Sequence, residues 1–591
     1  MDSSHQSPPP NSDPSSVAQL RRDQLIDRQT LALERLAVVS DPTYRPKQRL
    51  AAKLVGLILA GSAVVLAGYE FVRFVIEAHE HRTMIDNWVE AARELYEIEG
   101  NAEAATELLG NAAEMDPQSA AVVKLSAYID GMQTVESLIN LDRPLSKEDV
   151  SRYARAAGQA VMLERVDPDS TDWAVLRGQL AIVANEPVRA RRYLERAIEL
   201  DPMNAFAVMR MALVHRTLAL AAVDELTRAA ELKSCSELLK EALAMNPRSK
   251  WTLLWMGTLA LEQAHDPVLA RVHFSSAIEI DPRFANAHHS LGEAAVSLEE
   301  WSVAEKCYVR ALEIRPDLAA SLTGLAYVYG ARDLYEIGLR YARKATVADP
   351  GSLGAWRMRG RLAREVAKEV AQIQDDSSSK DALEEAILAY TNALDLDPRN
   401  GDAYIERSAL YQQASQLTEA GNDARNAVLF APLDPYAWNA LAKVQAQAGF
   451  HREASQSFGE VVKLEVRFDE AYLGRAQAEA VLGEFAAATS DFDLALEHST
   501  DEMRTDILLA RGKFRASRTE YESALADCIA ARTKDERLFE AWIAEAEVLK
   551  SMGRFDDSRA AARRALMLRP NDANAQSLEK SEDVNPVAPP T

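Results

Sequence analysis

The sequence predicts an all-α chain of stacked helical hairpins, an α-solenoid, and three observations lead to this prediction. The first is a step of 34 residues, which separates Pro282, Pro316 and Pro350. The second is a pattern of small and aromatic residues that recurs within each step. The third is the number of steps, about 13 between residues 86 and 570. Periods of this length mark hairpins that must stack, because one hairpin cannot bury its own apolar face.

The step over residues 285–316 illustrates the internal pattern. Its first apolar-periodic segment contains Gly292, and its second contains Ala304, Tyr308 and Ala311 at three- and four-residue spacing. That spacing places these side chains on one face of a helix. Small residues let two helices cross closely, and the aromatic side chain fills the gap on the facing side. The closing proline ends the second helix, because the residue before a proline disfavours the α conformation.

This pattern resembles that of the tetratricopeptide repeat (TPR) family. The clearest matching residues are Trp356, Gly360, Ala386, Tyr390, Ala393, Pro398, Trp438, Leu441, Ala454, Phe458, Tyr472, Ala488, Phe492, Ala495, Trp542, Ala565 and Pro570. The resemblance implies a right-handed superhelix of about 13 hairpins. It also implies that the first helix of each repeat lines a concave surface that binds proteins or peptides.

Three steps are longer than the period. Pro117 to Pro168 exceeds it by 17 residues, Pro202 to Pro247 by 11, and Pro350 to Pro398 by 14. Insertions in solenoids lengthen a helix or a loop on one face, often the binding face. The third insertion contains residues 375–379, Asp-Asp-Ser-Ser-Ser, which predict a loop.

A run of 16 uncharged residues, Leu54–Tyr69, predicts a membrane anchor. The run is slightly shorter than the roughly 17–25 residues of a transmembrane helix. Because the long stem of Lys53 can reach the headgroups, we place the span at residues 50–76. A buried soluble helix and a cleaved signal peptide are the alternatives.

Flanking charge predicts the orientation of this span. The nearby basic residues are Arg35, Arg45, Lys47, Arg49 and Lys53 before it, and Arg73, Arg82 and Arg93 after it. The positive-inside rule therefore places the N-terminal arm in the cytoplasm and the repeats on the opposite side. Because no Asn-x-Ser/Thr acceptor occurs, the sequence favours a bacterial inner membrane.

The predicted organisation has four parts. Residues 1–49 form a disordered to partly helical cytoplasmic arm, residues 50–76 the transmembrane helix, residues 86–570 the solenoid, and residues 571–591 a disordered tail.

Composition excludes several classes of function. Residues 1–53 carry a net charge of +2, so the remainder of a chain of net charge −23 is strongly acidic. An acidic solenoid is a poor partner for nucleic acid. The three cysteines are far apart and form no metal motif, and no catalytic or phosphate-binding motif occurs. We therefore predict no enzyme activity, no cofactor, no metal and no small-molecule substrate.

One cluster of charges predicts a binding site. Four basic residues recur at i, i+4, i+7 and i+11 on one helical face: Arg357, Arg361, Arg364 and Lys368. Such a basic strip suits an acidic peptide segment or a C-terminal carboxylate held by forked guanidinium bonds. The alternative is a solvated face that Glu365 and Glu369 partly neutralise.

The predicted function is a membrane-anchored scaffold that gathers proteins for envelope assembly, secretion or complex biogenesis. The alternative is a cytosol-facing docking receptor for chaperones or precursor proteins. Two specialised TPR site types are missing. The asparagines of the chaperone carboxylate clamp do not occur in matching register, and the asparagine ladder of the glycosyltransferase members is replaced by Ser290, Gly324, Glu406, Ala440 and Gly474.

Overall fold

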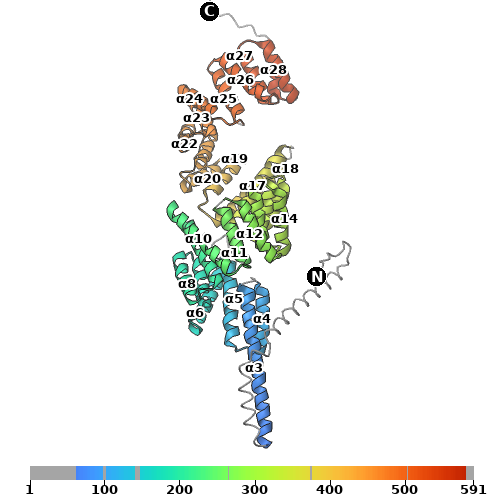
Figure 1. Cartoon of the computed structure of the whole chain (residues 1–591). Helices are drawn as coiled ribbons and strands as arrows, with labels where there is room; N and C mark the ends of the chain where they lie inside the picture. The colour runs from blue at the N-terminus through green and yellow to red at the C-terminus, as the bar shows by residue number, and fades with distance from the viewer. Residues whose placement is uncertain are drawn as a thin grey trace, which may run out of the picture. The chain divides into compact units, whose positions relative to one another are not determined.

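The computed structural model describes residues 62–97, 101–139, 145, 147–263, 265–372, 376–501 and 503–580. The regular structure of these residues consists of 27 α-helices, most of them in consecutive antiparallel pairs (Figure 1). This arrangement confirms the predicted all-α solenoid of about 13 hairpins.

The helices have the following bounds. The first helices of successive pairs are α5 (Ala120–Ile139), α7 (Asp172–Val183), α9 (Ala205–Ala221), α11 (Lys250–Glu262), α13 (Ala285–Ser297), α15 (Ala319–Gly330), α17 (Leu353–Gln372), α19 (Gly401–Gln413), α21 (Pro435–Gln447), α23 (Asp469–Leu482), α25 (Arg504–Ser517) and α27 (Phe539–Ser551). The second helices are α6 (Lys147–Val166), α8 (Pro187–Leu200), α10 (Glu225–Met245), α12 (Pro267–Ile280), α14 (Trp301–Ile314), α16 (Tyr335–Ala348), α18 (Asp376–Leu396), α20 (Leu417–Phe430), α22 (His451–Leu464), α24 (Phe485–His498), α26 (Tyr521–Lys534) and α28 (Phe555–Leu568). The remaining helices are α3 (Ser62–Glu97), α4 (Ala102–Met115) and α29 (Ala573–Glu579).

Backbone contacts divide the chain into two compact units. The first contains α3 up to Glu94, α4 from Glu103, and α5 up to Ser126, and the second contains the rest of the helices. In the second unit, each second helix contacts the first helix of the next pair, as α14 contacts α15 and α16 contacts α17. Stacking of this kind buries apolar side chains in clusters that each span helices of neighbouring repeats.

The helices begin and end where local chemistry dictates. Asn400 caps α19 by accepting a hydrogen bond from the backbone N–H of Ala403 at 3.0 Å. At the other end of a repeat, Arg315 leaves the helical conformation with φ −133° and ψ 93°, directly before Pro316. The predicted termination by proline is therefore confirmed at this repeat.

Close crossing within several hairpins depends on a glycine opposite an aromatic ring. A Cβ atom added at Gly292 would lie 2.6 Å from Cε1 of Tyr308, and one at Gly324 would lie 2.6 Å from Cζ of the same ring. A Cβ atom at Gly360 would meet the Tyr390 ring at the same distance. Tyr308 is thus held between two glycines of successive first helices, which links one repeat to the next.

The three long steps are long hairpins, because the insertions extend both helices of a pair. Helices α17 and α18 have 20 and 21 residues, and α9 and α10 have 17 and 21, whereas a standard pair such as α7 and α8 has 12 and 14. The loop predicted at residues 375–379 is wrong from Asp376 onward, where α18 begins; residue 375 lies outside the described residues. Ser379 Oγ donates to the Ala367 carbonyl at 2.9 Å, which favours its helical position.

The two ends of the chain are described only in part. The disorder predicted from residue 571 is wrong for α29, which buries Ala575 and Leu578; residues 581–591 lie outside the described residues. The predicted membrane span also begins outside them, since the description starts at residue 62. Within the described residues, none of the helices combines the length and the apolar character that a membrane crossing requires.

We expect Gly292→Ala to lower the free energy of unfolding by about 1–2 kcal/mol. Overpacking against Tyr308 costs about 1–3 kcal/mol, which exceeds the gain of about 1 kcal/mol in helix propensity. Gly158→Ala on α6 is the matched control, because no heavy atom lies within 4 Å of the added Cβ. Urea unfolding of the full chain measures both. Equal stabilisation by the two substitutions would show that the glycine–tyrosine contact has no role.

Candidate functional site

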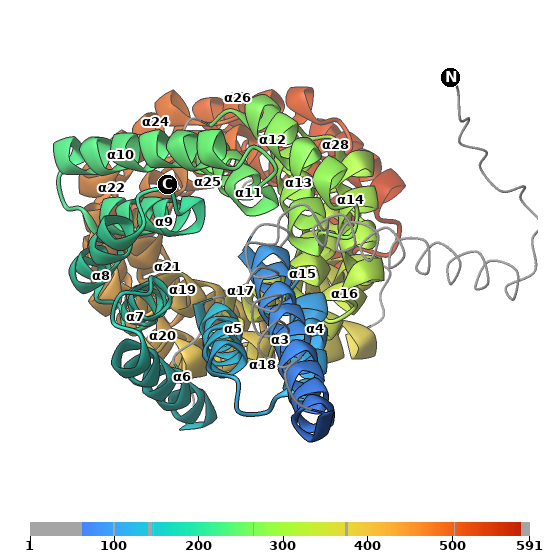
Figure 2. The same ribbon diagram turned by 60° about the horizontal axis from the view of Figure 1, so that its bottom comes forward.

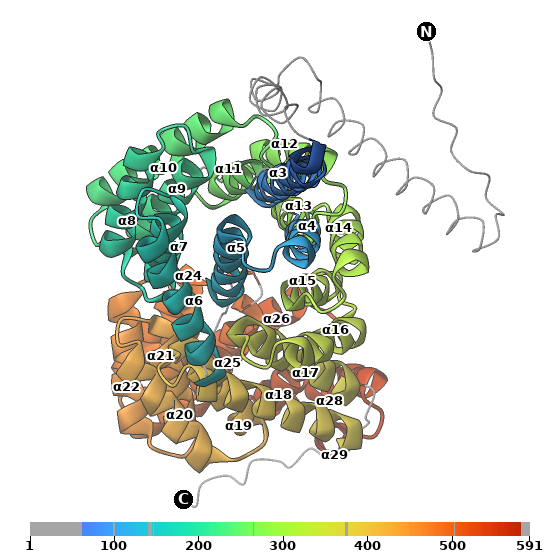
Figure 3. The same cartoon turned by 90° about the horizontal axis from the view of Figure 1, so that it is seen from below.

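The candidate site lies on the face formed by the first helices. Helices α9, α11, α15 and α17 follow one side of the stack, and α8, α10, α12, α14 and α16 follow the other (Figure 2). The first helices of successive repeats lie close together at most junctions between repeats. Examples are α13 with α15 and α15 with α17. Figure 3 shows α15, α16, α17 and α18 side by side. The first-helix face is therefore shared by consecutive repeats.

The predicted basic strip lies on α17, and three of its four residues have carboxylate partners. Arg357 pairs with Asp402 at 3.0 Å. Arg364 pairs with Glu406 and with Glu365. The ammonium group of Lys368 lies 3.1 Å from Glu365. Two of these carboxylates come from α19, so the next first helix neutralises much of the strip.

Arg361 differs from the rest of the strip. It is exposed, and within the described parts of the chain no carboxylate pairs with it. Its guanidinium carbon lies 5.6 Å from the centroid of the Tyr327 ring on α15. The Tyr327 ring in turn lies 6.3 Å from that of Trp301, at the start of α14. The strip therefore continues into two aromatic side chains, which spacing along the chain alone does not connect with it.

Charges in and around the basic strip shift the pKa values of Arg364 and of the nearby Tyr390. Burial lowers the pKa of Arg364, but the carboxylates of Glu406 and Glu365 outweigh burial and raise it. Burial raises the pKa of Tyr390, and Glu406 raises it further, while the nearby arginines lower it. Arg364 is thus held as a cation beside a neutral phenol, and its charge is used within the fold.

The ion pairs of Arg357 and Arg364 cross a joint where first helices stand further apart. After the long hairpins α9/α10 and α17/α18, the next first helices do not approach as closely as at the other joints. Arg216 of α9 crosses the first of these joints with bonds of 2.9 and 2.7 Å to Glu262 of α11. Arginine is long enough to replace direct helix packing here, and its fork matches a carboxylate.

Two other kinds of site, a metal centre and a reactive thiol, can be judged from the described residues. They contain no group of three or more His, Cys, Asp or Glu side chains that could hold a metal ion. All three cysteines are buried. Burial raises the pKa of Cys235 to about 11 and that of Cys528 to about 12. These thiols remain protonated at neutral pH and are weak nucleophiles.

Comparison with known families decides the class of the repeats. Residues 439–502 and residues 539–572 each match the tetratricopeptide repeat family. These two segments of the chain are tetratricopeptide repeats. The matched segments correspond to α21–α24 and to α27/α28. Similar helix lengths recur in pairs such as α11/α12 and α13/α14, where Gly257 and Gly292 contact the rings of Phe274 and Tyr308.

Two curated relatives match through part of their length. Protein O-mannosyl-transferase TMTC3 of Homo sapiens is 28% identical over 169 residues, which cover 27% of this chain and 17% of the relative. Tetratricopeptide repeat protein 37 of Xenopus laevis is 25% identical over 261 residues, which cover 43% of this chain and 16% of the relative. The chain spans less than a fifth of the length of either protein.

Two solved structures are similar to parts of the chain. A chain of the APC/C hetero-tetramer Cut9–Hcn1 is 15% identical and covers 83% of this protein and 95% of itself, with a TM-score of 0.39. A thermophilic TPR protein of Thermus thermophilus is 20% identical and covers 33% of this protein and 98% of itself, with a TM-score of 0.28.

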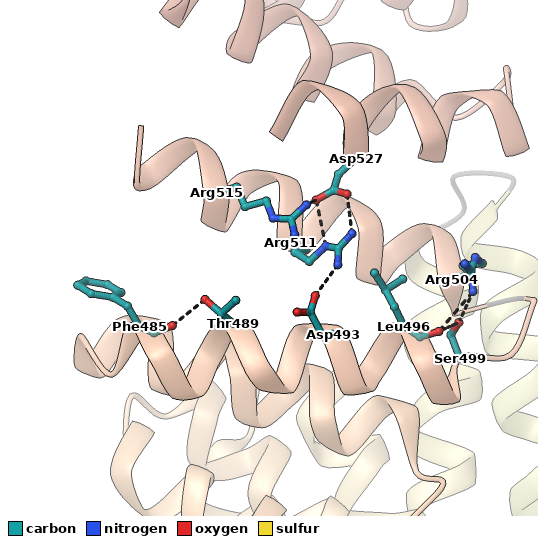
Figure 4. Close-up of polar contacts among 9 residues, drawn as sticks. All are labelled: Phe485, Thr489, Asp493, Leu496, Ser499, Arg504, Arg511, Arg515 and Asp527. Carbon is teal, nitrogen blue, oxygen red and sulfur yellow. Dashed lines mark hydrogen bonds and ion pairs between the residues drawn. The ribbon is translucent and has the colours of Figure 1, made fainter. Parts of the chain in front are cut away.

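The TPR motif departs from its usual form at one buried position. The family pattern has a leucine before the small residue of the first helix. Five repeats of this protein have an arginine there, namely Arg177, Arg359, Arg407, Arg475 and Arg511. In three of them the arginine pairs with a buried aspartate of the second helix: Arg407 with Asp423, Arg475 with Asp491, and Arg511 with Asp527. Figure 4 shows that Asp527 pairs with both Arg511 and Arg515. Arg511 also pairs with Asp493 of the previous repeat at 2.6 Å.

One carboxyl next to these pairs is unusual. Glu479 of α23 is 8% exposed, and its Oε2 atom has no hydrogen-bond partner among the described residues. Burial raises the pKa of Glu479 to about 7, and the Asp491 carboxylate adds to the rise. Arg475 counteracts this effect from 3.9 Å. The sequence alone gave no signal for this group, because acidic residues are common throughout the chain.

We expect Asp423→Ala to destabilise the protein by about 3 kcal/mol. It leaves the guanidinium of Arg407 buried without its carboxylate, whose bonds are 2.7 and 2.9 Å long. The double variant Arg407→Leu with Asp423→Ala restores the usual leucine and should recover most of the loss. Urea unfolding measures both, with Arg357→Gln at an exposed pair as a control that costs under about 1 kcal/mol. Equal losses in the single and double variants would contradict this account.

Proposed function

We propose that this TPR protein is a membrane-anchored scaffold that binds segments of other proteins on its first-helix face. The observation that carries the proposal is the continuous run of stacked hairpins, whose first helices present one shared surface. TPR domains bind proteins and peptides. Within the strip of Arg357, Arg361, Arg364 and Lys368, the cation of Arg361 favours acidic segments or C-termini, since charge complementarity selects partners and speeds association.

The anchor belongs to this proposal. The uncharged run Leu54–Tyr69 supports a single span, and the excess of basic residues before it supports repeats outside the cytoplasm. We place the protein in a bacterial inner membrane, where the scaffold would serve envelope assembly, secretion or complex biogenesis. A cytosol-facing docking receptor for chaperones or precursor proteins would need the reverse orientation.

We propose binding rather than catalysis as the activity. The human relative is named as a transferase, and the match covers 17% of its length. The basic strip, with its ion pairs and aromatic neighbours, is suited to recognising charge, and the three thiols are protonated and buried.

We expect the full chain, purified in detergent, to capture partners from native membranes through Arg361. Arg361→Glu reverses the charge at the one position of the strip that has no carboxylate partner among the described residues. It should reduce the captured amount of acidic partners at least tenfold. Arg340→Glu is the matched control, because Arg340 is exposed on the second helix α16 and no described carboxylate pairs with it. Quantitative mass spectrometry measures the difference. Equal capture by both variants would reject the strip as the binding site, and no partner enriched by the wild type would reject the scaffold.

The orientation has its own test. We expect alkaline phosphatase fused after Thr591 to be active in a bacterial host, because this enzyme folds only outside the cytoplasm. A fusion of green fluorescent protein at the same residue should then stay dark after export through the Sec pathway. The opposite pair of results, with both fusions in the membrane fraction, would favour the cytosol-facing receptor. Both fusions in the soluble fraction would reject the anchor.

A further inference from the structure

We propose that Trp301, Tyr327 and Arg361 form one recognition site for an extended peptide segment with an acidic residue two positions from an aromatic residue. This inference rests on the proposed binding function and narrows it from a basic strip to one cation with two rings. The site joins three elements that are far apart in sequence, namely α14, α15 and α17.

The cation of this site is available, whereas its neighbours are not. Arg357 and Arg364 are engaged by Asp402 and Glu406 of α19. The nearby Glu365 is engaged by Arg364 and Lys368. An incoming carboxylate would have to displace these partners, but at Arg361 it meets no competing carboxylate among the described residues. It can therefore form a forked pair there without breaking an existing one.

The two rings supply what a cation alone lacks. Arg361 lies 5.6 Å from the Tyr327 ring, and Tyr327 lies 6.3 Å from Trp301 at an interplanar angle of 52°. Both rings are half-buried, so each is fixed by its repeat and still presents an edge or face to solvent. Trp301 packs against a buried cluster that includes Ala304 and Tyr308. Tryptophan, tyrosine and arginine are the side chains that dominate binding energy at protein interfaces.

The distances set the spacing in the ligand. Alternate side chains of an extended segment point the same way and are about 7 Å apart. A carboxylate bound by Arg361 therefore places the side chain two residues away near Tyr327 and Trp301. An aromatic side chain there makes tilted ring contacts, which add affinity beyond the area that they bury. The acid and the aromatic ring must both be present for the full effect.

The test uses short peptides of defined sequence. The probe is the N-acetylated and C-amidated peptide Gly-Ser-Glu-Ser-Phe-Ser-Gly, whose only carboxylate is that of glutamate. Control peptides replace Glu by Lys, or Phe by Ala. Isothermal titration of the full chain in detergent should give a dissociation constant at least tenfold lower for the probe than for either control. Raising the salt concentration should weaken the binding of the probe.

Protein variants place the binding at the three residues. We expect Arg361→Gln, Tyr327→Leu and Trp301→Leu each to weaken the probe at least fivefold. Trp301→Phe should retain most of the binding, which separates a lost contact from a lost fold. Arg361→Lys should be intermediate, because lysine keeps the charge but loses the fork. Arg340→Gln on α16 is the matched control and should leave the dissociation constant unchanged.

Several results would overturn the inference. Equal affinity for probe and control peptides would remove the predicted selectivity. Unchanged binding in Arg361→Gln would remove the site, even if the probe binds elsewhere. Partners captured from membranes by the full chain, together with no binding of the probe, would leave the scaffold standing and refute this ligand class. If the probe binds but the full chain captures no partners, the scaffold function is refuted and the peptide site at Arg361 stands.

Discussion

The close crossing of the two helices in each hairpin is the constraint on which the structure depends. In α13/α14 a glycine on one helix faces a large ring on the other, at Gly292 and Tyr308. Because the same ring also meets Gly324 of the next repeat, this contact sets both the hairpin and the stacking. Stability in such a stack is the sum of repeats and their interfaces, so a local fault is transmitted mainly to its neighbours.

Ion pairs interrupt the apolar packing of the hairpins at defined positions. Pairs such as Arg407 with Asp423 replace the usual leucine inside a hairpin. Such pairs add less net stability than apolar packing, because both charges must be desolvated, but they make each side chain depend on its partner. The pairs that cross from α17 to α19 have a different role. They connect first helices where a long hairpin prevents close packing.

The repeat period predicted the fold well because it reflects stacking directly. The site was harder to predict. Helical spacing correctly placed Arg357, Arg361 and Arg364 on one helix, but it could not show that Asp402 and Glu406 face two of them, since a 14-residue insertion separates the repeats. Likewise the run at residues 375–379 has loop composition, yet Asp and Ser also suit the first turn of a helix, and packing of the long hairpin decided the outcome from Asp376 onward.

These ion pairs change how binding on this face should be understood. A strip of four free cations would attract any acidic surface, with strong salt dependence and little selectivity. In this protein the internal carboxylates neutralise most of the strip and leave Arg361 beside Tyr327 and Trp301. Because its neighbours are neutralised, the strip attracts acidic surfaces less strongly. A fixed ring next to an unpaired guanidinium binds most tightly a ligand that offers both an acid and an aromatic group. Selectivity then comes from the combination of charge and shape rather than from the amount of charge.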